Sequence, residues 1–251
     1  FRILDFCDMT VEGTFPLGAA TAVTAITNGM SPLLATLLAA LVGALAGLIT
    51  GLLYTKGKIP SLLAGILTMT AAYSVNLRIM GKSNISLLGK PTLLNGKFLS
   101  SLPQYFDSVV LGFIVIAIVT AVLIFFLNTD FGQAFIVTGD NRMTAEALGI
   151  HTDSMVNIGL MISNAMVGLC GALVAQNNGY ADVNMGIGTI VIALASIIIG
   201  EVAFGELTLP QRLVAVTLGS IIYRLTLLAV LQIGFSANDL NLISSIVLAL
   251  C

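Results

Sequence analysis

The chain has 251 residues, of which 57% are hydrophobic and 9% are charged, and its formal net charge is −2. Soluble domains carry roughly 25% charged residues, so a chain with a mean hydropathy of +1.05 must face lipid over most of its surface. The slightly negative charge excludes a nucleic-acid partner that relies on a basic surface. We therefore predict an all-α, polytopic transmembrane helical bundle with about seven or eight membrane segments, some of them short or broken.

The first uncharged stretch lies between Glu12 and Lys56, which is about forty residues and enough for two crossings of roughly twenty residues each. A break is expected at residues 28–29, and Pro32 suits the first turn of the second helix. Residues 15–27 are too few for a full crossing, so we expect a half-helix or a steeply embedded helix there.

Small residues recur at every fourth position of the second crossing, at Ala35, Ala39, Gly43, Gly47 and Gly51. This spacing places them on one helix face, where another backbone can approach closely. We predict that this ridge packs against a helix and does not bind a ligand.

The next predicted span, residues 59–79, follows a short loop that contains two lysines and is predicted to be cytoplasmic. Polar groups in lipid are costly unless they are paired or line a wet cavity. Serine and threonine can bond carbonyls of their own helix, so local bonding and a substrate path are both open alternatives. The candidates for a translocation path in this span are Thr68, Thr70, Tyr73, Ser74 and Asn76, of which Thr70, Tyr73 and Ser74 share one helix face.

The following segments are predicted to alternate across the membrane. Residues 78–107 form an outer loop, and residues 108–128 return the chain to the cytoplasm. Residues 154–176 cross outward with Asn164 deep in the span. Asn164 is a further path candidate, and a hydrogen bond to another helix is the alternative.

A short apolar segment flanked by glycine and followed by a longer helix occurs at residues 15–55 and again at residues 186–231. This similarity between the two segments suggests an internal repeat around a pathway at the middle of the membrane. The last apolar run, residues 242–251, is predicted to turn inward. Because the sequence starts at Phe1 without a methionine and stops inside that run, we expect an N-terminal span and a C-terminal end to be missing from it.

The longest polar interval of the second half, residues 128–153, contains a short predicted helix with a start signal and a stop signal. Gly139 breaks the chain, Asp140 is a suitable N-cap, residues 141–148 are mostly helix formers, and Gly149 is a suitable C′ glycine. We predict that this helix is a docking surface for another protein. A connecting loop that happens to be helical is the alternative.

Several catalytic patterns are absent from the sequence. It contains no G-x-x-x-x-G-K-[ST] phosphate loop and no Ser/His/Asp or H-E-x-x-H arrangement. The single histidine, His151, has no cysteine near it, and Cys7, Cys170 and Cys251 lack the spacing of a metal site or a disulfide framework. We therefore predict no catalytic residue, no metal and no cofactor, so the energy of any active transport must come from a partner or an ion gradient.

The polar interval also carries a sequence signature. It resembles the cytoplasmic G-x-N-x-x-A-A-x-x-x-G-I pattern of binding-protein-dependent ABC importer permeases of the branched-chain amino acid and ribose kind. Gly139, Asn141, Ala145, Gly149 and Ile150 match it, while a threonine replaces the first alanine. Residues 8–20, 58–72 and 185–201 also look like this family, and residues 8–17 and 59–69 look closest to a bacterial subgroup linked to uptake of tryptophan or related aromatic amino acids.

The resemblance implies a single permease domain over residues 1–251, in the bacterial inner membrane, paired with a second copy. Its partners would be two cytoplasmic ATPases, which hydrolyse ATP in its place, and an extracellular or periplasmic substrate-binding protein. Residues 128–153 would be the coupling loop, in which Ala145 and Ala147 are small enough to enter a groove. Arg142 and Glu146 stand one turn apart and can pair with each other or with the partner. The implied coupling residues are Asp140, Asn141, Arg142, Ala145, Glu146 and Gly149.

Other functions remain open at this point. The same machinery could carry branched-chain amino acids, a sugar or a nucleoside. A stand-alone secondary transporter or facilitator would need embedded carboxylates for ion coupling, and the apolar runs contain none. A membrane scaffold without a substrate is a third alternative, against which the polar residues of the spans argue only mildly.

Overall fold

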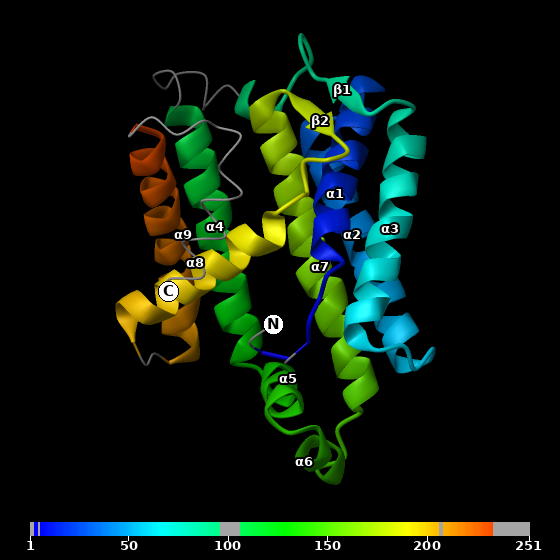
Figure 1. Ribbon diagram of the computed structural model, residues 1–251, viewed down its shortest axis with the longest axis vertical. Helices are drawn as coiled ribbons and strands as arrows, with labels where there is room; N and C mark the ends of the chain where they lie inside the picture. Colours follow the sequence, from blue (N-terminus) through cyan, green and yellow to red (C-terminus); the bar gives the residue numbers. More distant parts are fainter. Residues whose placement is uncertain (1–2, 5, 96–105, 206–207, 233–251) are drawn as a thin grey trace. The chain divides into compact units, whose positions relative to one another are not determined.

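The structure is a computed structural model that describes residues 3–4, 6–95, 106–205 and 208–232 (Figure 1). The chain divides into two compact units, Phe1–Gly186 and Ile187–Cys251. Helices dominate the described parts of both units, and one pair of short strands occurs in the first. The predicted all-α class is therefore confirmed.

The first unit is a bundle of long helices with two short helices at one end (Figure 1). Its elements are α1 (Val11–Thr27), α2 (Pro32–Thr55), α3 (Ser61–Met80), β1 (Asn84–Ser86), the 3-10 turn η1 (Leu93–Asn95), α4 (Phe106–Leu127), α5 (Asp130–Asp140), α6 (Arg142–Ala147), α7 (Thr152–Asn178) and β2 (Tyr180–Asp182).

The second unit contains α8 (Thr189–Phe204) and α9 (Leu209–Gln232), which pack against each other. Tyr223 is fully buried and packs with Ala195 and Leu227 between the two helices. The backbones come close where Gly200 faces Ala215, because a Cβ on Gly200 would lie only 2.6 Å from the Ala215 carbonyl oxygen.

Five of the described helices are long and apolar enough to cross a membrane. They are α2, α3, α4 over Ser108–Leu127, α7, and α9 over Gln211–Ala229. Helices α1 and α8 are shorter, with 17 and 16 residues. The predicted final run, residues 242–251, lies outside the described residues, as do residues 96–105 of the predicted outer loop.

Helix α1 lies at the centre of the first unit, among α2, α3 and α7 (Figure 1). Its residues Ala19, Ala22 and Val23 are fully buried. Twelve of its seventeen residues are buried, so other helices cover most of its apolar surface. The prediction that residues 15–27 are too short for a full span fits this helix, which begins part-way along the bundle.

The predicted small-residue ridge of α2 lies against α7. A Cβ on Gly47 would lie 2.7 Å from the Leu160 carbonyl carbon, and Gly43 faces the Asn164 backbone just as closely. Gly51 faces Asn157 further along the same two helices. Glycine lets the two backbones approach to a distance at which any side chain would overlap, so dispersion contacts and interhelical bonds form between them.

The sequence interpretation missed two features of this unit. Strands β1 and β2 pair antiparallel, with Ile85 opposite Ala181, and join the segment after α3 to the end of α7. Helix α5 occupies residues that were treated as part of a polar interval, and it buries Phe135 against Phe126 and Phe131.

Candidate functional site

Helices α5 and α6 lie at the end of the first unit opposite the strand pair (Figure 1). Helix α6 is capped at both ends by residues of its own segment. At its C-terminal end, Gly149 adopts the left-handed conformation (φ +82°), as predicted for a C′ glycine. The Gly149 amide donates to the Glu146 carbonyl and the Ile150 amide donates to the Ala145 carbonyl, both at 3.0 Å. These two bonds form a Schellman motif, which satisfies the last carbonyls of the helix.

The prediction that Asp140 caps this helix is wrong. Asp140 is the last residue of α5, and the cap is Asn141, whose side-chain oxygen accepts a hydrogen bond from the Thr144 amide at 3.1 Å. Asn141 can do this because its backbone is extended (φ −154°), which separates α5 from α6. Asparagine and aspartate are both good N-caps, so the sequence alone could not choose between neighbours.

The exposed face of α6 differs from the one expected. Ala145 is 0% exposed and packs inward, so it does not reach a partner that binds from outside. Met143 and Leu148 are 79% and 68% exposed, and Ala147 lies exposed between them. The small residue of the signature therefore seats the helix on the bundle, while these three residues form an apolar outer face. The sequence contained a signal for this face, because Met143 and Leu148 are two large apolar residues in a short capped helix.

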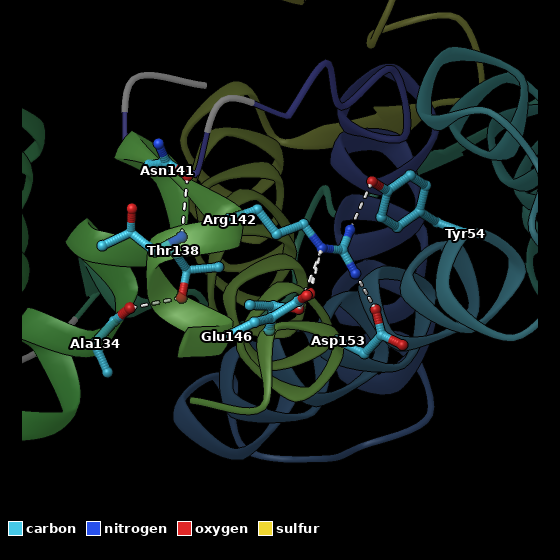
Figure 2. A network of polar contacts seen from close by, with 9 residues as sticks. Tyr54, Ala134, Thr138, Asn141, Arg142, Glu146 and Asp153 are labelled. Atoms are coloured by element: carbon cyan, nitrogen blue, oxygen red, sulfur yellow. Dashed lines mark hydrogen bonds and ion pairs between the residues drawn. The ribbon is translucent and has the colours of Figure 1, made fainter. Parts of the chain in front are cut away.

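Arg142 connects α6 to the ends of two membrane helices (Figure 2). Its Nη1 donates to the Tyr54 hydroxyl at 3.1 Å, at the end of α2, and its Nη2 forms an ion pair with the Asp153 carboxylate, at the start of α7. Its Nε donates to Thr152 Oγ1 at 3.1 Å and to Glu146 Oε1 at 3.3 Å. The Thr152 hydroxyl donates in turn to Glu146 at 2.8 Å. We call these five residues the Arg142 clamp.

The predicted pairing of Arg142 with Glu146 is thus present, but it is only one part of the clamp. Burial lowers the pKa of Arg142, and the bonds and charges of Glu146, Tyr54 and Asp153 outweigh burial, so the net effect raises this pKa. The pKa of Glu146 is lowered, first by the hydrogen bond from Thr152 and then by the bond from Arg142. Both side chains therefore remain charged at neutral pH, which maintains the ion pairs of the Arg142 clamp.

The predicted path residues separate into two groups. Thr68, Asn76 and Asn164 are buried, whereas Thr70, Tyr73 and Ser74 are exposed on another face of α3. The Thr70 hydroxyl donates to the carbonyl of Ile66 in its own helix, which is the local alternative that the sequence left open.

Asn164 belongs to a cluster that lies between α1, α2, α3 and α7. Its Nδ2 donates to Asp8 Oδ2 at 2.7 Å, and its Oδ1 accepts from the Thr14 hydroxyl at 2.8 Å. The hydroxyls of Thr10, Thr50 and Thr68 form a chain with separations of 2.8 and 2.9 Å. The buried polar cluster therefore consists of Asp8, Thr10, Thr14, Thr50, Thr68 and Asn164.

Asn76 does not join this cluster. It is 0% exposed, and neither of its amide atoms has a hydrogen-bond partner among the described residues. The same part of the chain contains no group of three or more His, Cys, Asp or Glu side chains that could hold a metal ion.

Comparison with known proteins places the chain in a family. All 251 residues match the family described as the permease component of branched-chain amino acid transport systems. The chain belongs to this family. It is therefore a multi-pass membrane permease of a bacterial binding-protein-dependent ABC importer and is not itself an ATPase. Family membership implies ATPase and binding-protein partners in general, and it decides against the stand-alone transporter and the scaffold.

Two curated relatives cover nearly the whole chain. The chain is 44% identical over 248 residues to the tyrosine transport system permease protein of Clostridioides difficile, covering 99% of this chain and 81% of that protein. It is 34% identical over 252 residues to an uncharacterized protein of Rickettsia prowazekii, covering 99% of this chain and 87% of that protein.

A more distant relative is the autoinducer 2 import system permease protein LsrC of Yersinia enterocolitica. It is 31% identical over 196 residues, which is 78% of this chain and 53% of that protein. No solved structure matches the chain significantly.

Proposed function

We propose that this permease imports tryptophan or a related aromatic amino acid. It works with a second permease copy, two cytoplasmic ATPases and a substrate-binding protein on the outer side of the membrane. The observation that supports the substrate class is the 44% identity to a permease named for tyrosine transport. A branched-chain amino acid on the same scaffold is the second candidate, because the family description names that substrate class. A sugar or a nucleoside is the remaining alternative.

The substrate is tested by ATP hydrolysis of the reconstituted full complex with its binding protein. The binding protein is loaded in turn with tryptophan, tyrosine, leucine or ribose. We expect the two aromatic amino acids to stimulate hydrolysis and to be taken up. Stimulation by leucine or ribose alone would refute the aromatic substrate and leave the importer intact.

We further propose that α6 is the helix on which the ATPase docks, as part of a coupling loop over residues 128–153. Exposed apolar side chains outside the membrane are costly unless a partner covers them, and Met143, Ala147 and Leu148 form such a surface. The Arg142 clamp supports this role, because a docking helix must be fixed to the membrane helices that it moves.

The docking proposal is tested by co-purification of the ATPase with Met143→Glu and Leu148→Glu permeases. We expect each substitution to lower ATPase recovery by more than about tenfold, because a carboxylate would be desolvated in an apolar contact. Leu88→Glu is the matched control, since Leu88 is 90% exposed in the loop after β1. Full recovery of the ATPase with both α6 variants would show that this surface is not the docking site.

For the path itself, we propose that Thr70, Tyr73 and Ser74 face the second permease copy across a wet pathway. Their exposed position on a membrane helix supports this, since polar groups facing lipid are disfavoured. In a background without native cysteines, Ser74→Cys should react with a water-soluble thiol reagent and be protected by substrate. Phe113→Cys, at an exposed position of α4, is the control and should not react. Equal reaction rates at both positions would remove these residues from the path.

A further inference from the structure

The Arg142 clamp is one end of a longer series of contacts in the first unit. Tyr54 receives the Arg142 hydrogen bond on its hydroxyl, and the guanidinium carbon lies 6.0 Å from the centre of its ring. Tyr54 is next to the last residue of α2. A shift of α6 therefore either carries the end of α2 with it or breaks this bond.

The ring of Tyr54 also contacts Phe6. The two rings meet edge to face, with centroids 5.2 Å apart and planes at 89°. This geometry is favourable beyond the apolar area that it buries. Phe6 is 5% exposed and packs in a core cluster with Val156 and Leu160 of α7. It begins the lead-in, residues 6–10, which connects the α6 end of the bundle to the start of α1.

The chain just before the lead-in lies in a narrow space. A Cβ on Gly139 of α5 would overlap the Ile3 carbonyl, and one on Gly159 of α7 would overlap the Leu4 side chain. The backbone of Ile3 is thus in direct contact with α5, and the side chain of Leu4 is in direct contact with α7. Displacement of α5 and α6 cannot leave this segment unmoved, because close-packed groups transmit strain.

The far end of the lead-in is fixed in the buried polar cluster. Asp8 accepts from the Thr10 amide at 3.0 Å with one carboxylate oxygen and from Asn164 at 2.7 Å with the other. Thr10 bonds Thr50, and Thr50 bonds Thr68. Moving Asp8 would therefore break its bonds to the Thr10 amide and to Asn164 of α7 or carry these groups with it, and Thr10 in turn bonds the hydroxyls that link α2 and α3. Breaking such buried bonds is costly unless new partners are found.

We propose that Tyr54 is a positioning residue of the transport cycle, which transmits displacement of α6 through Phe6 to Asp8 and so to the buried polar cluster. This proposal rests on the docking role of α6 proposed above. The contacts from Arg142 to Asp8 are contiguous, and mutation of the residues between them measures the coupling.

The test uses the full complex in proteoliposomes and measures three quantities: ATPase recovery, ATP hydrolysis, and substrate taken up per ATP hydrolysed. Tyr54→Phe removes the bond to Arg142 and keeps the ring on Phe6. Phe6→Leu keeps an apolar side chain and removes the ring contact. Tyr180→Phe is the matched control, because Tyr180 is exposed in β2 at the opposite end of the unit.

We expect Tyr54→Phe and Phe6→Leu each to lower uptake per ATP by at least about fivefold, with ATPase recovery unchanged. The double variant should be no worse than the more severe single variant, since both interrupt the same series of contacts. A residue with a structural role alone would reduce the amount of complex and leave uptake per ATP the same.

Unchanged uptake per ATP in Tyr54→Phe would overturn the proposal that displacement of α6 is transmitted through Tyr54 and Phe6. Loss of ATPase recovery in that variant would also overturn it and would assign Tyr54 to docking. Failure of the docking proposal is a separate result, because it shows as full ATPase recovery with Met143→Glu. Loss of ATPase recovery in Met143→Glu together with normal uptake per ATP in Tyr54→Phe would refute only the transmission through Tyr54 and Phe6.

Discussion

Two buried asparagines in the first unit should respond to the same substitution with changes in stability of different size. Asn164 and Asn76 are both 0% exposed, but Asn164 makes two side-chain bonds to the buried polar cluster, and Asn76 has no partner among the described residues. Replacement by alanine removes the same atoms at both positions. The difference between the two variants therefore isolates the hydrogen bonds from the cavity.

Asn164→Ala leaves the Thr14 hydroxyl and one oxygen of Asp8 without their partner. Leaving a buried polar group unpaired costs about 1–3 kcal/mol. The threonine can turn to a carbonyl of its own helix, so we expect a total loss of about 2–4 kcal/mol. At about 2–4 °C per kcal/mol for a chain of this size, the unfolding temperature should fall by about 4–16 °C.

Asn76→Ala removes an amide that already carries this penalty. The gain should offset the lost packing, so stability should change by less than about 1 kcal/mol in either direction. The assay is thermal unfolding of the purified permease at one scan rate, because membrane proteins unfold irreversibly and the transition depends on that rate. Equal losses of stability in both variants would refute the hydrogen-bond reasoning.

Three further predictions test individual contacts. Gly47→Ala should destabilise the permease by about 1–3 kcal/mol in the same unfolding assay, because its Cβ overlaps the α7 backbone; Gly112→Ala, which meets nothing within 4 Å among the described residues, is the neutral control. Gly149→Ala should lower ATPase recovery because its backbone is left-handed, and Gly149→Asn should restore part of it, since asparagine tolerates this conformation. Because the pKa of Glu146 is lowered, its contribution to stability is complete above the ordinary glutamate range and is lost only as pH falls through the lowered value. Docking should therefore be constant between about pH 6 and 8, and a steep change in ATPase recovery there would contradict the assignment.

The sequence predicted the long elements well because their signal is spread over many residues. Pro32 opens α2 as expected, and the predicted span 59–79 corresponds to α3 within two residues at its start and one at its end. Lipid imposes a nearly uniform requirement for apolar side chains, so hydropathy alone locates such helices. The short elements lack that redundancy. Strand β1 has three residues and pairs with a strand far along the chain, which local patterns do not reveal.

The site was predicted in position but not in detail. The signature located α6, and Gly149 was recognised because a glycine just past a helix end commonly adopts the left-handed conformation that it has here. The direction of Ala145 could not be predicted, since a small residue fits a partner's groove and a packed interior equally well. Tyr54 was missed because its contact with Arg142 links residues that are 88 apart in sequence. The split between Thr68 and Thr70 follows from the helical period, but which face is covered depends on neighbouring helices.

The central place of α1 has a consequence for how the protein is made. Thr14 of α1 bonds Asn164 of α7, which is 150 residues later in the chain. Translation at about 5–20 residues per second delivers α7 roughly 8–30 s after α1. Throughout that interval α2 and α3 can already pack on α1, but Thr14 and the face of α1 that packs on α7 have no cover. A ribosome-bound intermediate that ends before α7 should therefore depend on the insertion machinery to shelter α1, and stalled chains of this length should be preferred substrates for membrane proteases.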